Sequence, residues 1–516
     1  MLKKVVIVDF GSQVTQLIAR SVRSQKVYCE VVPFNKFSLK YIKNENPVGI
    51  ILSGSPLSVT KRGFPSIKRE IFFLGIPILG ICYGMQLISS ALGGKIKKIS
   101  GREYGDTSIR VIKKSSICPN NWKTKTKHNV WMSHGDSVKT LPKNFISFAK
   151  SNNENFVGIA NEKMKIFGLQ FHPEVTHTKD GKSIIKKFLF EVCKCKPQWN
   201  MKKFKKENIT LLKKKLVNKK VICGLSGGVD SSVAALLLNK AIGKRLLCIF
   251  VDHGLLRMGE KKEIHNFFKR KSNFKFISVD ASKQFMKVLK GVTDPEKKRK
   301  LIGKEFIKTF DKCANKYKGI EYLAQGTLYP DVIESRSVTG APSATIKSHH
   351  NVGGLPKKMN LKLVEPLNTL FKDEVRILGK ELGLSDNIRN RHPFPGPGLA
   401  IRILGEVTKS RLEILRQADK IYIDLLKKEK LYDKIWQAFC VLLPVKTVGV
   451  MGDSRTYENV CAIRAVTSVD GMTADYYHFD QTFLKKVSNN IINKVKGINR
   501  VVYDTTSKPP GTIEWE

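Results

Sequence analysis

Two segments far apart in the chain share one local pattern, in which an apolar run leads through a turn of small residues into a helix-like segment. The first is PILGICYGMQLISSALGG at residues 77–94, and the second is VICGLSGGVDSSVAALLLNKAIG at residues 221–243. Around both, further apolar runs end in glycine, aspartate or other turn-forming residues, as buried parallel strands do before their loops. The pattern indicates an α/β architecture, and its recurrence predicts two such sheets.

The length of the chain and two breaks in its composition predict the domain organisation. With 516 residues, the chain exceeds the about 250–300 residues that one hydrophobic core supports. A lysine-rich stretch at 201–220 precedes the second pattern, and the proline-rich segment RHPFPGPG at 391–398 excludes a continuing helix or central strand. We therefore expect the α/β fold class, with two doubly wound α/β domains at residues 1–198 and 199–391 and a smaller α+β domain at 392–516.

Composition argues against several classes of protein. No stretch approaches the about 20 apolar residues of a membrane span, and the beginning of the chain has no signal-peptide pattern, so we expect a cytoplasmic protein without membrane contacts. The ten cysteines lack disulfide or zinc spacing, including the lone Cys193-x-Cys195 pair, and are expected to be reduced. The formal net charge of +48 comes from lysines spread over the whole sequence, which predicts steering of anionic nucleotides and no specific nucleic-acid partner.

A nucleophile and a base stand at the ends of two predicted strands in the first domain. Cys82 lies in the turn Gly80-x-Cys82-x-Gly84, where glycines permit a strained backbone and the following helix N-terminus favours a thiolate. His172 and Glu174 follow the strand-like run GLQF, and a base oriented by a carboxylate completes the requirements for cysteine-based acyl transfer. We therefore predict Cys82, His172 and Glu174 as catalytic residues.

Together with the segments LSGSP and SHGD, these motifs resemble those of the class I glutamine amidotransferases. The resemblance implies that the cysteine attacks the side-chain amide of glutamine, ammonia leaves, and water hydrolyses the glutamyl thioester. It also implies that backbone N–H groups in the neighbourhood of Gly54 and Tyr83 hold the tetrahedral oxyanion. Ser55 stands where the family usually has a second glycine, which leaves the conformation of that loop open.

The turn of the second pattern predicts a phosphate site. Its consecutive small residues let backbone amides converge, the helix N-terminus favours negative charge, and the serine hydroxyls donate further hydrogen bonds. It is not a Walker A loop, since no Gly-Lys-Ser/Thr follows at the required spacing. The residues predicted to surround the phosphates are Ser226, Gly227, Gly228, Val229, Asp230, Ser231 and Ser232.

The sequence SGGVDSS resembles the PP-loop of ATP pyrophosphatases, which cleave ATP between its α and β phosphates and transfer AMP to a substrate oxygen. The resemblance implies ATP as co-substrate and Asp230 as the carboxylate that places Mg²⁺ on the departing pyrophosphate. The next strand, in CIFVDHGLLR, lies where the fold of that family usually holds the adenine, so Val251, Asp252 and Leu256 are weaker candidates than the loop residues. His253 stands where the family commonly has asparagine, and its effect on the adenine contacts is left open.

The order of the two sites and several later segments resemble the glutamine-hydrolysing GMP synthetases. The segments include AQGTLYPDVIES, LVEPLNTLFKDEVR and the terminal RVVYDTTSKPPGTIEWE. The resemblance implies guanine nucleotide biosynthesis de novo, in which ammonia from glutamine displaces AMP from adenylated xanthosine monophosphate (XMP). It also implies a homodimer paired through the region after His392.

The terminal segment is the part implied to bind XMP. Arg500 and Lys508 are expected to hold the nucleotide phosphate, and Glu514 to accept hydrogen bonds from the purine or ribose. Chain ends are mobile unless tied down, so we expect a mobile tail that closes over the substrate. Arg336, outside this segment and less firmly matched to a family motif, is a further candidate for the phosphate. The residues predicted to bind XMP are thus Arg336, Arg500, Lys508, Ile513 and Glu514.

Other kinds of protein fit parts of the sequence. An RNA-modifying PP-loop enzyme would use the positive charge to bind tRNA, but no cysteine pair or extra RNA-binding domain is visible. An amidotransferase acting on nicotinate adenine dinucleotide, aspartate or UTP would share the first site, and the ending TSKPPGTIEWE argues against it. A binding protein without activity would leave two complete chemical sites unused.

Overall fold

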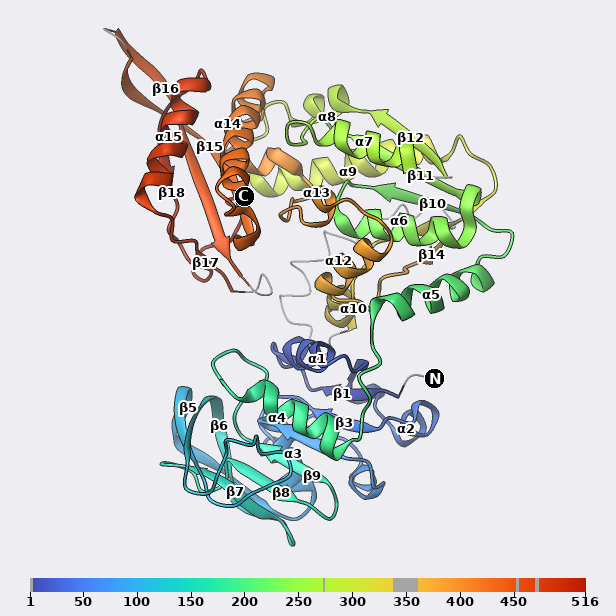
Figure 1. Cartoon of the computed structure of the whole chain (residues 1–516), viewed down its shortest axis with the longest axis vertical. Coiled ribbons are helices and arrows are strands. Elements are labelled where there is room, and N and C mark those ends of the chain that lie inside the picture. Colours follow the sequence, from blue (N-terminus) through green and yellow to red (C-terminus); the bar gives the residue numbers. More distant parts are fainter. Residues whose placement is uncertain (1–2, 272–273, 337–360, 452–453, 469–472) are drawn as a thin grey trace. The chain divides into compact units, whose positions relative to one another are not determined.

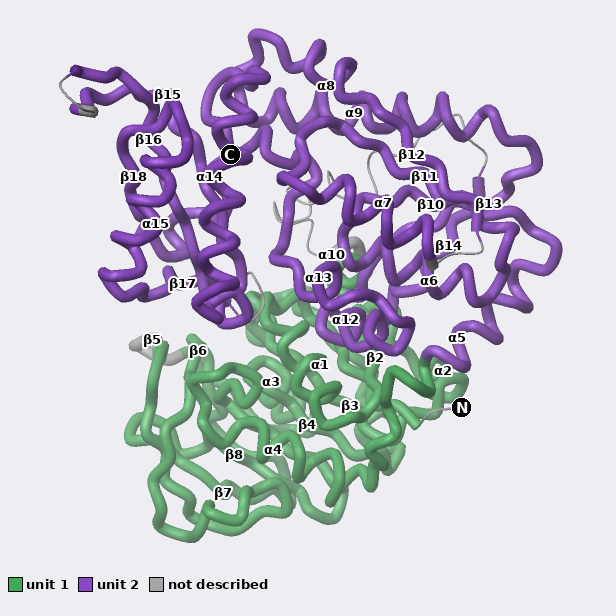
Figure 2. Tube along the Cα trace, turned by 45° about the horizontal axis from the view of Figure 1, so that its top comes forward, with its two compact units in different colours: residues 1–204, 330–345 green, residues 205–329, 346–516 purple. Residues whose placement is uncertain are grey.

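The fold comes from a computed structural model, in which the chain forms two compact units. Unit 1 holds residues 1–204 with 330–345, and unit 2 holds residues 205–329 with 346–516 (Figure 2). The division at 204–205 lies near the expected end of the first domain, and the three-domain boundaries stay predictions. The structure describes residues 3–271, 274–336, 361–451, 454–468 and 473–516.

Unit 1 is built on one mixed sheet (Figure 1). Its strands are β1 (Val5–Asp9), β2 (Cys29–Pro33), β3 (Gly49–Leu52), β4 (Ile78–Ile81), β5 (Lys95–Val111), β6 (Lys127–Thr140), β7 (Ile146–Ser151), β8 (Gly158–Asn161) and β9 (Ile166–Leu169). They lie in the order β2-β1-β3-β4-β9-β8-β7-β5-β6. The strands from β2 to β9 in this order are parallel, and their valine- and isoleucine-rich runs are buried, as a sheet covered on both faces requires.

The antiparallel half of this sheet was not foreseen from the sequence. The hairpin of β5 and β6 is long, and its residues alternate between buried and exposed positions instead of forming a compact apolar run. Local signals do explain helix ends, such as Ser38, whose hydroxyl accepts a hydrogen bond from Tyr41 N at the start of α2. The helices of unit 1 before residue 200 are α1 (Thr15–Ser24), η1 (Phe34–Lys36), α2 (Leu39–Glu45), η2 (Arg69–Phe73), α3 (Tyr83–Ala91), α4 (Gly181–Lys187) and η3 (Phe188–Val192).

The larger sheet of unit 2 is entirely parallel. Its strands are β10 (Lys220–Leu225), β11 (Leu246–Asp252), β12 (Lys275–Asp280), β13 (Ile320–Ala324) and β14 (Lys362–Val364). They lie in the order β12-β11-β10-β13-β14. The chain therefore builds outward from β10 first on one side and then on the other, and the carboxyl end of β10 is the switch point at which such sheets bind ligands.

Helices connect these strands. The longest begins as its sequence predicts, because Asp294 accepts a hydrogen bond from Lys297 N at 2.7 Å and Pro295 occupies the first helical position. The helices between residues 201 and 389 are α5 (Met201–Lys215), α6 (Val229–Ile242), η4 (Gly243–Arg245), α7 (Glu260–Lys271), α8 (Ser282–Leu289), α9 (Pro295–Ala314), α10 (Tyr329–Arg336), α12 (Lys372–Glu381) and α13 (Asp386–Arg389). Within the ranges that the structure describes, no helix is long and apolar enough to cross a membrane.

The last part of unit 2 is a smaller sheet with its own helices. Its elements are η5 (Gly398–Arg402), α14 (Lys409–Lys428), η6 (Tyr432–Lys434), β15 (Gln437–Met451), β16 (Ser454–Thr467), β17 (Asp475–Tyr476), α15 (Gln481–Lys494) and β18 (Ile498–Tyr503). β16 pairs antiparallel with β15 and β17 and parallel with β18. One core joins Ile249 of the larger sheet to Leu415 and Ile463 of this part. The expected fold class, α/β with a smaller α+β C-terminal part, is confirmed.

Candidate active site

The carboxyl ends of three neighbouring parallel strands gather the first site in unit 1. β4 lies between β3 and β9, so the loops that follow these strands leave the same edge of the sheet. These loops carry Gly54, Cys82 and His172. The sheet thereby brings together predicted site residues that lie far apart in the sequence.

Cys82 occupies a strained turn between β4 and α3. Its φ is 53° and its ψ is −105°, a region that residues with side chains rarely adopt. The flanking glycines are required by close contacts. A Cβ on Gly80 would lie 2.5 Å from the Gly84 carbonyl, and one on Gly84 would lie 2.4 Å from the Leu52 carbonyl oxygen. Strand, strained residue and helix N-terminus have the geometry of a nucleophile elbow.

His172 and Glu174 form a buried pair beside this turn. Nδ1 of His172 lies 2.7 Å from Oε1 of Glu174, whose side chain is fully buried. The carboxylate accepts the hydrogen bond from Nδ1, which leaves Nε2 for Cys82, the other hydrogen-bond partner of the ring. Burial lowers the pKa of His172, but the Glu174 charge and the hydrogen bonds to Cys82 and Glu174 outweigh it and hold this pKa well above its ordinary value.

Gly54 and Tyr83 supply the two backbone N–H groups predicted to hold an oxyanion. In the part of the chain that the structure describes, neither group donates a hydrogen bond, and a Cβ on Gly54 would lie 3.6 Å from Cε1 of His172. Ser55 keeps its backbone outside the left-handed region, and its hydroxyl accepts a hydrogen bond from Leu57 N at 3.1 Å. The departure from the family pattern at Ser55 is thus accommodated, and both N–H groups are available to a ligand.

The turn between β10 and α6 in unit 2 is an open cradle of hydroxyl and backbone groups. Gly227 has a φ of 80°, and a Cβ there would lie 2.2 Å from the Ile264 side chain. The Ser226 hydroxyl accepts a hydrogen bond from Gly228 N at 3.3 Å and lies 3.1 Å from the Ser231 hydroxyl. Ser226 and Gly228 are exposed. Exposed N–H and O–H donors at a helix N-terminus are the arrangement that binds phosphate.

The other residues of the loop face different surroundings. Val229 and Ser232 are buried, and the Ser232 hydroxyl donates to the Gly228 carbonyl at 2.8 Å. Oδ2 of Asp230 forms an ion pair with Lys372, while Oδ1 is buried and has no hydrogen-bond partner among the residues described. Across those same residues, no cluster of three or more His, Cys, Asp or Glu side chains could hold a metal. One carboxylate oxygen left for a ligand beside a phosphate cradle fits a hard cation that binds together with pyrophosphate.

Val251 and Asp252 end β11, the parallel neighbour of β10, and so reach the same edge of the sheet as the phosphate loop. Both are buried, as is Leu256. Burial lowers the pKa of His253 to about 4, and Nδ1 of this ring accepts a hydrogen bond from a backbone N–H two residues on. The histidine that replaces the usual asparagine is therefore a neutral, buried side chain.

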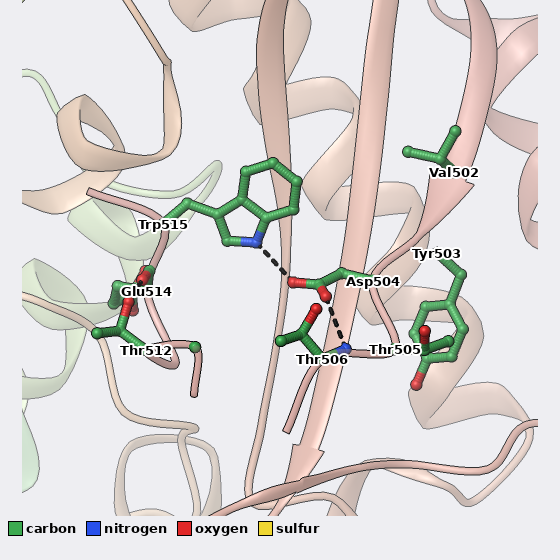
Figure 3. Close-up of a pocket in the computed structure, with 9 residues that line it drawn as sticks. Val502, Tyr503, Asp504, Thr505, Thr506, Thr512, Glu514 and Trp515 are labelled. Carbon is green, nitrogen blue, oxygen red and sulfur yellow. Dashed lines mark hydrogen bonds between the residues drawn. The ribbon is translucent and has the colours of Figure 1, made fainter. Parts of the chain in front are cut away.

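A cavity of about 430 Å³ lies between the end of β18 and the last residues of the chain (Figure 3). As the figure shows, the Trp515 indole N–H donates to the Asp504 carboxylate at 2.9 Å, and this carboxylate also accepts from Thr506 N at 2.9 Å. Of the residues expected to bind XMP, Glu514 lines the cavity. The lining residues are Val502, Tyr503, Asp504, Thr505, Thr506, Gly511, Thr512, Glu514 and Trp515.

The tail that forms one wall of this cavity is tied down. Arg402 donates two hydrogen bonds to the Glu514 carboxylate, at 3.0 and 2.8 Å, and Gln437 donates a third at 2.6 Å. The fully buried Lys298 pairs with Glu516 at 2.5 Å. The structure differs here from the expected mobile tail, because charged groups that a chain end usually leaves in water are paired inside unit 2.

The remaining residues predicted to bind XMP lie at different depths. Arg500 is exposed on β18, two positions before the cavity-lining Val502, and does not itself line the cavity. Lys508 is partly buried, and its backbone pairs with the segment that leads into β17. Ile513 is buried. Arg336 is the last residue of α10, and its side chain lies outside the described part of the structure.

Comparisons with known proteins match almost the whole chain. The family described as Glutamine amidotransferase class-I matches residues 6–192, NAD synthase matches 202–309, and the GMP synthase C terminal domain matches 424–515. A protein from Brucella canis named GMP synthase (glutamine-hydrolyzing) is 57% identical over 512 residues, which cover 99% of this chain and 98% of the relative. The chain belongs to the glutamine-hydrolysing GMP synthase family. The predicted family and enzyme class, a ligase with a glutamine amidotransferase domain, are thereby confirmed.

A second relative has the same name. The GMP synthase of Brucella ovis is 56% identical over 512 residues, covering 99% of this chain and 98% of the relative. Among solved structures, a glutamine amidotransferase from Thermotoga maritima is 20% identical with a TM-score of 0.28, and the match covers 38% of this chain and 88% of that one.

Two basic residues beside the phosphate loop were missed by the sequence reasoning. Lys372, the partner of Asp230, is the first residue of α12 and lies within the segment LVEPLNTLFKDEVR. Arg391 donates from Nη1 to the Gly227 carbonyl at 3.2 Å and pairs with Glu263 at 2.6 Å. In a chain with 92 lysines and arginines, no local signal separates these two from the rest.

Proposed function

We propose that this member of the GMP synthase family forms GMP from XMP in three steps. Glutamine is hydrolysed in unit 1, ATP adenylates XMP in unit 2 with release of pyrophosphate, and ammonia displaces AMP from the adenylated XMP. The observation that carries the proposal is the strained Cys82 turn beside the buried His172–Glu174 pair, because this combination serves covalent acyl chemistry. The relatives are named GMP synthase, which supports GMP as the product.

The first step starts from a thiolate and an imidazolium. Sγ of Cys82 attacks the carboxamide carbon of glutamine, and negative charge moves to the amide oxygen, toward the N–H groups of Gly54 and Tyr83. His172 gives its proton to the departing nitrogen, which leaves as ammonia. Water then attacks the thioester while His172 takes up a proton, and glutamate leaves as the sulfur is restored. Glu174 keeps the imidazole in place throughout.

In unit 2, the phosphates of ATP occupy the loop of residues 226–232. The C2 oxygen of XMP attacks the α-phosphorus, the bond to the bridging oxygen breaks, and pyrophosphate leaves. Lys372 and the N–H groups of the loop stabilise the charge on the leaving group. Mg²⁺ held by Asp230 would supply a Lewis acid that neutralises pyrophosphate charge, and Oδ1 of this residue is the oxygen left to hold it. Val251 borders the adenine at the neighbouring strand end.

We assign XMP to the cavity between β18 and the tail. Arg500 and Lys508 are the cations for its phosphate, since charge-assisted hydrogen bonds are the strong ones. The Glu514 carboxylate already accepts three hydrogen bonds, two from Arg402 and one from Gln437, and a carboxylate can accept about four. It therefore keeps about one position for a purine or ribose donor, and its main task is to hold the wall of the cavity.

We also infer a homodimer through the hairpin of β15 and β16. Val448 and Tyr457 are cross-strand partners on this hairpin and both are exposed, and Val450 nearby is 75% exposed. Contiguous exposed apolar side chains mark an association surface. Light scattering should show a dimer that Val450→Glu dissociates, whereas a wild-type monomer with full activity at all working concentrations would refute the inference.

The overall proposal is tested by giving the protein XMP, Mg-ATP and either glutamine or ammonium, and measuring GMP, AMP and glutamate. GMP and AMP should form in equal amounts from both nitrogen sources, and glutamate only from glutamine. Nicotinate adenine dinucleotide in place of XMP serves as the control and should not be amidated. Absence of GMP with both nitrogen sources, or amidation of the control compound, contradicts the proposal.

A further inference from the structure

Gln170 is a fully buried polar residue that the chemistry above leaves without a role. It directly follows β9, two residues before His172, and its backbone N–H donates to the Val157 carbonyl at 2.9 Å. Its side-chain Nε2 lies 3.7 Å from Sγ of Cys82, within hydrogen-bonding distance of sulfur. A buried carboxamide requires partners for its N–H and carbonyl groups, so this contact is part of how the residue is satisfied.

A second buried amide determines which end of Gln170 faces the sulfur. Nε2 of Gln86 donates to Oε1 of Gln170 at 3.4 Å and to the Asp136 carbonyl at 2.8 Å. Both hydrogens on that nitrogen are then used, so a flipped Gln170 would set its own NH₂ group against a donor. Gln86 is itself positioned by α3, where its backbone N–H donates to the Cys82 carbonyl at 3.2 Å. The two amides therefore present an N–H to Sγ.

The partners of Sγ change when the thiol ionises. As a thiol, Cys82 donates to the Ser133 carbonyl, 3.5 Å away. A thiolate has no proton for that carbonyl and accepts hydrogen bonds instead, from Gln170 and His172. Hydrogen bonds to a charged acceptor are about twice as strong as those between neutral groups. The Gln170 contact thus favours the ionised sulfur, and the Ser133 contact favours the neutral one.

We propose that the side-chain N–H of Gln170 stabilises the thiolate of Cys82 and holds the sulfur beside His172 before glutamine binds. This inference rests on Cys82 being the nucleophile of the proposed function. In the thioester the sulfur is uncharged and the negative charge has left it, so Gln170 acts on the resting enzyme and on the restored thiolate. Loss of Gln170 lowers the reactive fraction of Cys82 at a given pH and leaves the oxyanion N–H groups in place.

The test is the pH dependence of Cys82 alkylation by iodoacetamide in the full-length protein, followed by mass spectrometry of the peptide that contains Cys82. Gln170→Leu removes the donor at similar volume, and we expect the midpoint of alkylation to rise by about one pH unit, since a hydrogen bond to a charged group is worth a factor of about ten or more. Glutamine hydrolysis at pH 7 should fall about tenfold, while ammonium-dependent GMP synthesis stays at the wild-type level.

Two further variants separate this role from a structural one. Gln86→Leu frees the Gln170 amide to rotate and should shift the midpoint in the same direction by a smaller amount. Ser89→Ala removes another fully buried polar group of α3 and should leave the midpoint unchanged. If Gln170→Leu does not fold, Gln86→Leu provides the measurement.

The inference is overturned if the alkylation midpoint of folded Gln170→Leu is unchanged. If Gln170→Leu does not fold, an unchanged midpoint in Gln86→Leu overturns it. Glutaminase activity does not alter either conclusion. Failure of the proposed function is recognised separately, because Cys82→Ala would then still hydrolyse glutamine.

Discussion

The Cys82 turn of unit 1 and the 226–232 loop of unit 2 both lead from a parallel strand into a helix, but they assign the unusual backbone conformation to different residues. In unit 1 it falls on Cys82 itself, with a φ of 53°, and in unit 2 on the spacer Gly227, with a φ of 80°. Cys82 is only 6% exposed, whereas Ser226 and Gly228 are exposed.

The difference fits the tasks that we propose for the two turns. A covalent nucleophile must offer one side chain in a closed site beside its base, so the strain falls on that residue. A phosphate cradle must offer several backbone N–H groups to a large anion, so a glycine takes the unusual conformation and the loop stays open. The same strand–turn–helix unit can thus serve either task, depending on where the glycines stand.

Replacing the proposed nucleophile should have the largest effect on activity. Cys82→Ala should lower glutamine-dependent GMP formation by about 10³-fold or more, since no thioester can form. Synthesis from ammonium should stay at the wild-type level, because it uses only unit 2. Cys118→Ala, which removes another buried thiol of unit 1, is the control. Equal loss with both nitrogen sources would show that the two turns do not work independently.

The opposite pattern is expected from the phosphate loop. Asp230→Asn should reduce GMP formation from glutamine and from ammonium alike, by about 10²-fold or more, because the carboxylate that holds the cation is gone. Glutamine hydrolysis should persist. Asp311→Asn, which changes another unit 2 acid with an unpartnered buried oxygen, is the matched control. Full ammonium-dependent synthesis in Asp230→Asn would sink the assignment.

Removing the residues after Asp504 should weaken XMP binding and, because Arg402 and Lys298 lose their partners, also lower the stability of unit 2. The dissociation constant of XMP should rise about 10–100-fold, because charge-assisted hydrogen bonds contribute about 1.5–3 kcal/mol each. Glutamine hydrolysis should remain, since its groups lie in unit 1. Glu516→Gln weakens only the pair with Lys298 and should cost less. Isothermal titration that finds equal XMP affinity in the truncated and full-length proteins would exclude the tail from the site.

Replacing one glycine of each turn with alanine should lower the free energy of unfolding by different amounts. Gly80→Ala places a Cβ 2.5 Å from backbone atoms of Gly84 and should lower the free energy of unfolding by about 1–3 kcal/mol. Gly228→Ala meets only the Ser226 hydroxyl, at 3.3 Å, which can move. Urea unfolding of the two variants measures the difference. A larger loss of unfolding free energy in Gly228→Ala than in Gly80→Ala would contradict the inference that the Cys82 turn is the more tightly packed of the two.

The smallest effect concerns the strand next to the phosphate loop. The pKa of His253 is about 4 in the folded protein and about 6.5 when unfolded, so the stability it contributes is present above pH 6.5 and is lost as the pH falls toward 4. At pH 5.5 the loss is about 1.4 kcal/mol. His253→Asn should remove this part of the acid destabilisation. The measurement is the unfolding free energy of the wild-type protein and of His253→Asn at pH 7.5 and 5.5. An equal decrease between the two pH values in both proteins would contradict this prediction.

Much of the architecture could be predicted from local sequence. Apolar runs that lead into a turn identify the strands β4 and β10, because burial on both faces leaves no polar alternation. The same local patterns led to the prediction of Cys82, His172 and Glu174 as catalytic residues, because the prediction depends on residue type at a strand end. The β5–β6 hairpin was missed because its residues alternate in burial and form no compact run.

By itself, then, the sequence determined the parallel strands, the α/β class and the residue types at the ends of those strands. Only the tertiary structure decided which side chains contact one another. Gln170 contacts Cys82 from 88 positions away, Lys372 contacts Asp230 from 142, and Arg402 contacts Glu514 from 112. Strand order and helix packing set such contacts, and a chain rich in lysine offers many equivalent cations for each carboxylate. The C-terminal tail illustrates the same point, because two of the residues that anchor it, Lys298 and Arg402, lie more than a hundred positions away and no local pattern reveals them.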